Sequence, residues 1–314
     1  MPELPEVETV ARTLAPQVCG RRIVDVEVLN KGSWQGLTAP EAVAGLRPVI
    51  RGTGRRGKLL FLYLSQEEGF PHPEAEIPAP CEASLWPLFY SAHGVEQGRP
   101  SLVGRISGEV TALAFHLRMT GRLFVYGEGE EPGKHTRVVL TLDDGRRVFF
   151  DDARKFGQAR AVCADELGAW DFWKKLGPEP LEMTDEAFAA RFSSGRAVKA
   201  LLLDQSVVAG VGNIYADESL FRARIRPEAP GKKLSPARLA KLHRALVEVL
   251  LDSIHECGSS IRDYRTAKGD VGAFQNRFFV YGRAGETCLV CGKKLASASV
   301  AGRSTVWCPH CQKA

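Results

Sequence analysis

The chain has 314 residues, of which 44% are hydrophobic and 25% are charged. This length allows two domains with hydrophobic cores, and the composition is too apolar for a mostly disordered chain. No run of 18 apolar residues occurs, and acidic side chains follow Met1 where a signal peptide would carry positive charge. We therefore expect a soluble cytoplasmic protein and exclude the exported and membrane-spanning classes.

The first predicted element is a helix at the amino terminus. Val7, Val10, Leu14 and Val18 recur at helical spacing, and Gly20 is placed to end the segment. The residues that follow favour β-structure, because valines alternate with acidic residues over 24–28 as in a half-buried strand. Further strands are predicted over 58–64, 110–117, 136–142 and 146–151. The last two are joined at Asp144-Gly145, which is typical of a hairpin turn.

The segment between Ser65 and Glu109 interrupts this strand pattern. It is rich in proline and glycine and far exceeds the roughly 4–6 residues of an ordinary connection. We interpret 65–109 as an insertion in a sheet. It either packs onto the body through aromatic residues such as Trp86 and Phe89 or forms a surface excursion.

The second half of the chain favours helices, so a domain boundary is predicted between 160 and 180. Ser235 and Pro236 suit the start of a helix, and an apolar face continues from them to Gly258. Two short helices are expected within 196–222, separated by the glycine-rich turn at 209–213.

The carboxyl-terminal segment is basic and contains paired cysteines. Residues 257–314 hold nine Lys and Arg against three acids, a net charge of +6, whereas the whole chain carries +5. Such a cluster is either a solvated surface or a surface for a polyanion. Two C-x2-C pairs stand sixteen residues apart, a spacing typical of a structural zinc hairpin with four thiolate ligands. The predicted ligands of this single Zn²⁺ ion are Cys288, Cys291, Cys308 and Cys311. His310 is interpreted as a bystander.

The amino-terminal sequence offers a candidate nucleophile. Removal of Met1 would leave Pro2 with a secondary amine whose reference pKa, about 7.7–8.0, keeps part of it neutral at physiological pH. A neutral amine can attack a sugar carbon and form an iminium. Glu3 could transfer protons at the sugar, and Glu6 could hold the amine in place. The alternative is that Pro5 simply begins a helix with acidic residues in its first turn, and composition and spacing alone favour that alternative.

Six motifs occur in an order that resembles the formamidopyrimidine-DNA glycosylase family. They are Pro-Glu-Leu-Pro-Glu-Val-Glu at 2–8, Arg-Gly-Lys at 56–58, His-Leu-Arg-Met-Thr-Gly at 116–121, Gly-Asn-Ile-Tyr-Ala at 212–216, Val-Tyr-Gly-Arg at 280–283 and the cysteine hairpin. The resemblance spans the chain apart from 65–109. It implies an α+β protein with a β-sandwich behind an opening helix at 1–160, a helix–two-turn–helix domain at 175–265 and a zinc hairpin at 280–314.

The resemblance also implies an activity and its catalytic residues. The expected protein is a monomeric DNA-repair enzyme of base excision repair that acts on damaged double-stranded DNA, associated with the nucleoid in the cytoplasm. It would remove 8-oxoguanine and formamidopyrimidines through a Schiff base on Pro2, with Glu3 as proton donor, and cleave the strand by β,δ-elimination. Lys58 would contact phosphate and transfer a proton in β-elimination. Arg303 would serve δ-elimination and phosphate binding.

The family's DNA contacts fall on further residues of this chain. Met119, Arg154 and Phe156 would fill the gap left by an everted nucleotide, although the residues alone would place Met119 and Phe156 in a core. The remaining DNA contacts implied by the resemblance are His116, His135, Asn213 and Tyr281. The segment 259–279 resembles the loop that closes over an oxidised purine.

The sequence departs from the family pattern at three places. Ala153 stands where the family has proline, a basic residue is missing near Ser194, and 65–109 is inserted. Two other functions are considered. An endonuclease VIII type enzyme for oxidised pyrimidines usually has glycine where this chain has Leu4, and a zinc-hairpin DNA-binding protein without catalysis would not need Pro2, Glu3 and Lys58 together.

Overall fold

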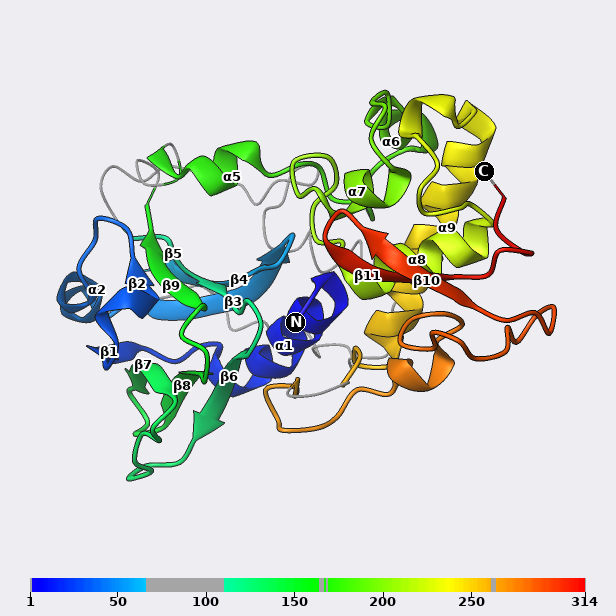
Figure 1. Ribbon diagram of the computed structural model, residues 1–314. Coiled ribbons are helices and arrows are strands. Elements are labelled where there is room, and N and C mark those ends of the chain that lie inside the picture. The colour runs from blue at the N-terminus through cyan, green and yellow to red at the C-terminus, as the bar shows by residue number, and fades with distance from the viewer. Residues whose placement is uncertain (1, 66–109, 164–166, 168, 261–263, 314) are drawn as a thin grey trace. The chain divides into compact units, whose positions relative to one another are not determined.

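The computed structural model describes residues 2–65, 110–163, 167, 169–260 and 264–313 (Figure 1). The prediction for 65–109 therefore concerns residues that lie, apart from Ser65, outside the described part of the chain. Two compact units are present. The first comprises Met1–Lys174 and Ile254–Ala273, and the second comprises Lys175–Ser253 and Phe274–Ala314.

The first unit opens with helix α1, Leu4–Val18, which confirms the predicted amino-terminal helix. Val7, Val10 and Leu14 are buried, as their spacing predicts. The helix is also buried on its other sides, so most of its side chains contact protein. It packs against strands β3 and β4 of one sheet and β6 of the other. This central placement puts the first residues of the chain inside the first unit.

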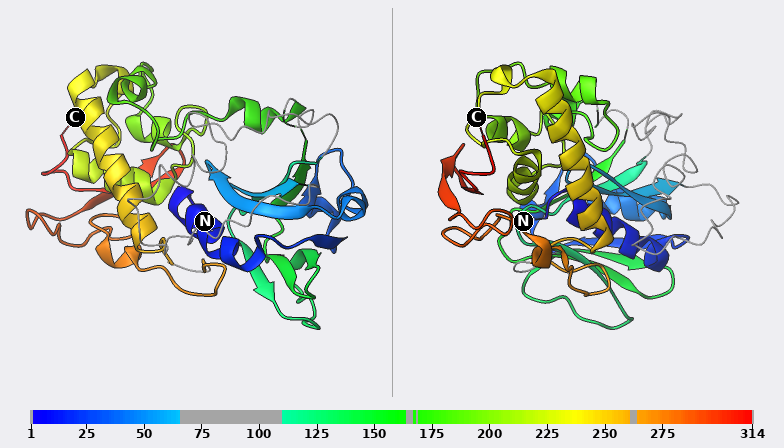
Figure 2. Two further views of the ribbon diagram at one scale, coloured as in Figure 1. Left: turned by 180° about the vertical axis from the view of Figure 1, so that it is seen from behind. Right: turned by 90° about the vertical axis from the view of Figure 1, so that its right-hand side faces the viewer.

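Two sheets form a β-sandwich behind α1 (Figures 1 and 2). One is antiparallel and contains, in spatial order, β1 Ile23–Val28, β7 Thr136–Leu142, β8 Arg147–Asp152 and β6 Gly121–Tyr126. The other contains β2 Trp34–Gln35, β9 Gln158–Val162, β5 Ala112–His116, β4 Leu59–Ser65 and β3 Val49–Arg56. Its strands are antiparallel except that β2 runs parallel to β9. Short helices η1 Lys31–Ser33 and α2 Pro40–Leu46 follow β1 and β2.

The facing sides of the two sheets share one hydrophobic core with α1. Phe115 of β5 and Phe150 of β8 meet there edge to face, with ring centroids 5.6 Å apart. The opposite side of the five-stranded sheet is covered by aromatic residues just before the second unit. The ring centroid of Trp173 in helix α5, Asp171–Lys175, lies 5.8 Å from that of Phe61.

The predicted strands within the described residues are present, and the hairpin at Asp144-Gly145 joins β7 to β8. Four strands of the described part were not predicted from the sequence: β2, β3, β6 and β9. Strand β3 reads Val-Ile-Arg-Gly-Thr-Gly-Arg-Arg, whose glycines and arginines hide the strand pattern. It forms because β4 pairs with it along most of its length.

The second unit contains the predicted helices. Its elements are α6 Asp185–Ala190, α7 Val198–Leu203, α8 Asn213–Ala223, η3 Gly231–Lys233, α9 Pro236–His255, η4 Phe274–Arg277, β10 Ala296–Val300 and β11 Arg303–Trp307. The last residues of α9 belong to the first unit. Helices α7 and α8 are the expected pair on either side of the glycine-rich turn. The predicted α+β class is confirmed. None of the described helices is long and apolar enough to cross a membrane.

Candidate active site and zinc centre

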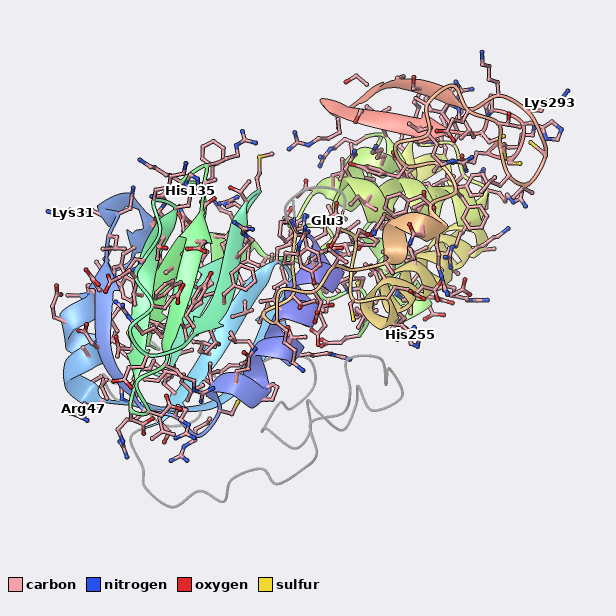
Figure 3. The ribbon with its side chains drawn as sticks, turned by 90° about the horizontal axis from the view of Figure 1, so that it is seen from below. Glu3, Lys31, Arg47, His135, His255 and Lys293 are labelled. Carbon is pink, nitrogen blue, oxygen red and sulfur yellow. The ribbon has the colours of Figure 1, made fainter. Side chains whose placement is uncertain are left out.

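The candidate nucleophile, Pro2, directly precedes Glu3, the residue before helix α1 that Figure 3 labels. Pro2, Glu3 and Glu6 are all buried. The Glu3 backbone N–H donates to one oxygen of the Glu6 carboxylate at 2.8 Å, and the Ser259 backbone N–H donates to the other at 2.8 Å. Glu6 therefore fixes the backbone immediately after Pro2 and ties it to the segment 254–273.

A glycine and a tyrosine complete the surroundings of Glu6. Gly258 has φ +84°, and a Cβ atom there would lie 3.1 Å from Cγ of Glu6, so both conformation and space favour glycine. Burial, assisted by the Glu6 carboxylate, raises the pKa of Tyr264 well above its usual value. Tyr264 therefore stays a neutral phenol beside Glu6.

Lys58 lies at the turn between β3 and β4, and it is buried despite its charge. The turn requires Gly57, whose φ of +58° is in the left-handed region. Helix α1 packs against both strands of this hairpin. The structure thus places Pro2, Glu3, Glu6 and Lys58 in the first unit.

His116 ends strand β5, and the adjacent β4 residue Leu59 pairs with it. Its Nδ1 atom accepts a hydrogen bond from the Arg118 backbone N–H at 3.1 Å, so a neutral ring carries its proton on Nε2. Burial, with smaller contributions from Arg118 and Lys58, lowers the pKa of His116 from 6.5 to about 3. The imidazole is therefore neutral at every physiological pH.

The neutral state of His116 predicts a pH dependence of stability. Below about pH 6.5 the unfolded chain takes up a proton at this side chain that the folded protein excludes until about pH 3. Stability should therefore fall as the pH falls through this window, by about 2 kcal/mol between pH 7 and pH 5 from this residue. Urea unfolding at both pH values measures the effect. A His116→Asn variant should lose that part of the pH dependence; an unchanged dependence would contradict the burial argument.

The three proposed gap-filling residues converge on one exposed point of the first unit. Met119 follows β5, and Arg154 and Phe156 follow β8; all three side chains are exposed. The Arg154 guanidinium donates from Nη1 to the Met119 sulfur at 3.1 Å and stacks 4.9 Å from the centre of the Phe156 ring. Exposed apolar side chains at a loop are not core residues, so placing Met119 and Phe156 in a core is wrong.

A buried carboxylate, which sequence reasoning did not single out, holds these two loops together. Asp152 is fully buried and accepts hydrogen bonds from the backbone N–H groups of Gly157 at 2.6 Å and Arg154 at 3.3 Å. It also accepts from the hydroxyl of Thr120, which follows Met119. Asp152 thus closes the turn in which Ala153 replaces the family's proline.

We expect Asp152→Asn to loosen the two loops, because an amide cannot accept hydrogen bonds on both of its terminal atoms. Leaving a buried donor unpaired costs about 1–3 kcal/mol, so affinity for lesion-containing duplex DNA should fall about 10-fold. Asp151→Asn is the matched control, since that neighbour bonds instead to Thr136. Fluorescence anisotropy with a lesion duplex measures both variants, and equal affinities for the two would refute this role of Asp152.

The remaining DNA-contact candidate of this unit, His135, lies just before β7 (Figure 3). It is half-buried, and its backbone carbonyl accepts a hydrogen bond from the Asp152 backbone N–H at 2.8 Å. His135 is therefore linked through the backbone to the turn that carries Arg154.

In the second unit, the structure brings Asn213 and Arg303 close together. Asn213 begins α8, and its Nδ2 atom donates to the Ser304 carbonyl at 2.9 Å. Arg303 precedes Ser304 at the exposed start of β11. Tyr281, which precedes the β10–β11 hairpin in the chain, is half-buried, and its backbone N–H donates to Glu218 of α8 at 2.8 Å.

Buried charges that the sequence did not reveal hold the hairpin against α8. Lys199 and Asp217 form an ion pair at 2.6 Å, and Lys199 also donates to the Ser304 carbonyl at 3.0 Å. Burial raises the pKa of Asp217 to about 6 against the opposing effect of Lys199, so Asp217 is mostly ionised at neutral pH. One feature of the sequence could have indicated that Lys199 is buried: it is the single charged residue in the otherwise apolar Val-Lys-Ala-Leu-Leu-Leu of α7.

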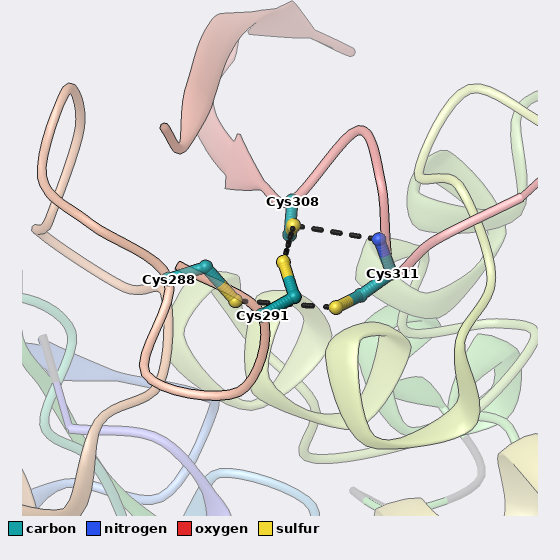
Figure 4. Close-up of side chains that lie close together, drawn as sticks. All are labelled: Cys288, Cys291, Cys308 and Cys311. Carbon is teal, nitrogen blue, oxygen red and sulfur yellow. Dashed lines mark hydrogen bonds between the residues drawn. The ribbon is translucent and has the colours of Figure 1, made fainter. Parts of the chain in front are cut away.

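The four predicted metal ligands meet in the second unit (Figure 4). Their sulfur atoms all lie within 4.8 Å of one another, with 3.5 Å between Cys291 and Cys308 and 4.0 Å between Cys288 and Cys311. Tetrahedral Zn²⁺ with Zn–S bonds near 2.3 Å requires sulfur atoms about 3.8 Å apart, so the cluster fits this ion. His310 is exposed and outside the cluster. The site holds one structural zinc ion, as the sequence predicted.

These features define the class of protein: a β-sandwich unit that opens with a helix, followed by a helical unit that carries a four-cysteine zinc hairpin. Residues 1–159 match the formamidopyrimidine-DNA glycosylase N-terminal domain, 176–265 its H2TH domain, and 285–314 the zinc finger found in FPG and IleRS. The chain belongs to the formamidopyrimidine-DNA glycosylase family. Its activity is that of a bifunctional DNA glycosylase and abasic-site lyase that removes oxidised purines.

Individual relatives match the whole chain. The formamidopyrimidine-DNA glycosylase of Nitratidesulfovibrio vulgaris is 47% identical, with 100% of each chain covered. The structure of MutM from Thermus thermophilus has a TM-score of 0.76 and 36% identity, covering 99% of this chain and 98% of that one. Lactococcus lactis Fpg bound to DNA with an abasic site has a TM-score of 0.77 and 30% identity, covering 99% and 100%. The family assignment excludes the non-catalytic alternative and decides against oxidised pyrimidines as the main substrate.

Proposed function

We propose that Pro2 is the nucleophile of the glycosylase and lyase reactions. The neutral amine forms a bond to C1′ of the damaged nucleotide, and the glycosidic bond breaks with its electron pair going to the departing base. Glu3, adjacent in the chain, transfers protons at the sugar during this step. The observation that carries the proposal is the burial of Pro2, Glu3 and Glu6 together, with Glu6 bonded to the backbone of Glu3.

Strand cleavage follows from the iminium that this attack produces. Lys58 is assigned to proton removal from C2′, after which the electron pair expels the 3′ phosphate in β-elimination. Arg303 is assigned to the 5′ phosphate that leaves in δ-elimination. The placement of Lys58 supports this role, since it lies buried at the turn between β3 and β4, the two strands against which α1 packs.

Damaged double-stranded DNA is the proposed partner, bound by a monomer at the chromosome in the cytoplasm. Solved relatives include complexes of Lactococcus lactis Fpg with DNA that contains an abasic site or Fapy-dG. Met119, Arg154 and Phe156 would enter the gap left by the everted nucleotide and recover part of the lost stacking. His116, as a neutral N–H donor, would bind phosphate, as would His135, Asn213 and Tyr281.

The three segments are proposed to divide this work. Residues 1–160 would carry the glycosylase chemistry, 175–265 the helix–two-turn–helix contacts and 280–314 the zinc hairpin. Lys232 is a candidate for the basic contact missing near Ser194, because it is exposed, bonds through its backbone N–H to the Ser194 carbonyl at 2.9 Å and lies beside Gly195.

Borohydride trapping tests the proposed chemistry. The protein is incubated with duplex DNA containing 8-oxoguanine opposite cytosine, and with a duplex containing an oxidised pyrimidine, in the presence of sodium borohydride. We expect a covalent adduct at Pro2, identified by mass spectrometry of the amino-terminal peptide, and faster excision of the oxidised purine. An adduct at another residue, or none on an abasic duplex, would overturn the assignment of Pro2.

A further inference from the structure

A buried arginine connects helix α1 to the turn that carries Lys58. The side chain of Arg55, at the end of β3, is only 1% exposed. Its Nε atom donates to Oε2 of Glu8 in α1 at 3.1 Å, and its Nη1 atom donates to the Gly57 carbonyl at 3.1 Å. One guanidinium therefore bonds simultaneously to the helix and to the turn.

The bond to Gly57 acts directly on Lys58. The carbonyl group of Gly57 and the nitrogen of Lys58 belong to the same planar peptide unit. A hydrogen bond that orients this carbonyl also orients the backbone from which the Lys58 side chain extends. Because Gly57 has φ +58°, the turn has a conformation that the backbone does not favour for other residues, and an external bond helps to fix it.

Docking of the helix onto the strand does not by itself explain this pair of bonds. Thr53, two residues earlier in β3, already donates its hydroxyl to the Ala11 carbonyl of α1 at 2.7 Å. Apolar residues would also dock the helix without the cost of burying Glu8 and Arg55, both of which are less than 5% exposed. Arginine offers what an apolar side chain cannot: N–H groups in fixed directions toward two acceptors.

We propose that Arg55 is a positioning residue that sets Lys58 relative to the amino-terminal helix and therefore to Pro2. Glu8 fixes the guanidinium from the helix side, and the guanidinium fixes the Gly57–Lys58 peptide. This inference rests on the roles proposed above for Pro2 and Lys58. Arg55 and Glu8 thereby contribute to the β-elimination step through Lys58, and neither of them contacts the substrate.

The test compares Arg55→Lys with Thr53→Val, which removes a hydrogen bond between the same helix and the same strand. Both are prepared in the wild-type chain and in a Lys58→Ala chain, with unfolding in urea measured for each. The readouts are the rate of β-elimination from a preformed abasic site in duplex DNA and the rate of borohydride trapping on that site.

We expect Arg55→Lys to slow β-elimination about 10-fold, since small displacements of a reacting group have effects of this size. Trapping should change less than about 3-fold, because the amine of Pro2 is not displaced. In the Lys58→Ala chain, Arg55→Lys should have no further effect. Thr53→Val should keep the ratio of elimination to trapping of the wild-type protein even if it lowers stability.

Two results would overturn the proposal. One is an effect of Arg55→Lys on the rate of β-elimination that is as large in the Lys58→Ala chain as in the wild-type chain. The other is a change in the ratio of elimination to trapping that is as large in Thr53→Val as in Arg55→Lys. If Arg55→Lys does not fold, Glu8→Gln takes its place in the same four-way comparison, with the same two overturning results. Failure of the wild-type protein to form any adduct would instead count against Pro2, so the two proposals fail in different ways.

Discussion

Substituting Pro2 with glycine is expected to lower the rate of adduct formation with an abasic duplex by at least about 100-fold. Glycine keeps an amine at the amino terminus, but that amine is primary and rotates freely, whereas the proline ring fixes the direction of its nitrogen. Borohydride trapping under single-turnover conditions measures the rate. Duplex binding, measured separately, should remain within about 3-fold of wild type, since no phosphate contact is removed.

A second variant distinguishes the role of the Pro2 amine from that of the Pro2 side chain. A short amino-terminal extension converts the Pro2 nitrogen into an amide, whose lone pair is delocalised into the carbonyl and cannot attack. Adduct formation should then disappear although Pro2, Glu3 and Glu6 are all retained. Glu3→Gln should instead form an adduct with a preformed abasic site and fail in excision of 8-oxoguanine. Undiminished trapping by the extended chain would contradict nucleophilic attack by Pro2.

Loss of the zinc ion should produce the second large effect. Structural zinc contributes about 10–16 kcal/mol to the folding of zinc-finger peptides. Pairing of the two five-residue strands β10 and β11 stabilises the hairpin far less than this. A Cys308→Ala variant, or the wild-type protein treated with a chelator, should lose one equivalent of zinc. Arg303 is adjacent to Ser304 in this hairpin, and Asn213 donates a hydrogen bond to the Ser304 carbonyl. Because both proposed DNA contacts depend on the hairpin, affinity for duplex DNA should fall about 100-fold.

The chemistry at the amino terminus provides the internal control for the zinc experiment. Pro2 lies in the other compact unit, so reductive trapping of a small sugar aldehyde such as deoxyribose 5-phosphate should survive zinc loss. Cys163→Ser is the matched cysteine variant, since Cys163 lies outside the cluster. Zinc content, duplex affinity and small-aldehyde trapping are measured together. Wild-type duplex affinity in the zinc-free protein would show that the hairpin makes no DNA contact.

The sequence alone determined the features that depend on residues close together in the chain. The helix at the amino terminus follows from apolar spacing, the β7–β8 hairpin from Asp144-Gly145, and the zinc ligands from pairs of cysteines with two residues between them. The likeness of six motifs to one family identified the activity, because such motifs preserve chemistry in a fixed order. Composition and spacing by themselves favoured the interpretation that Pro5 simply begins a helix over the interpretation that Pro2 is a nucleophile.

Only the tertiary structure decided which distant residues act together. Met119 and Arg154 are 35 positions apart, and they meet because the pairing of β6 with β8 brings their loops to one end of the sheet. Strand β3 escaped prediction for a related reason: its glycines and arginines are stabilised by pairing with β4.

The buried charges are the clearest case of information absent from the sequence. Asp152, Arg55 and Lys199 look like surface residues in a sequence, since charged side chains are usually solvated. Each is buried because other segments of the chain cover it and supply at least one of its partners. A buried charge is stable only where those partners have the right geometry, and that geometry exists only after the chain has folded.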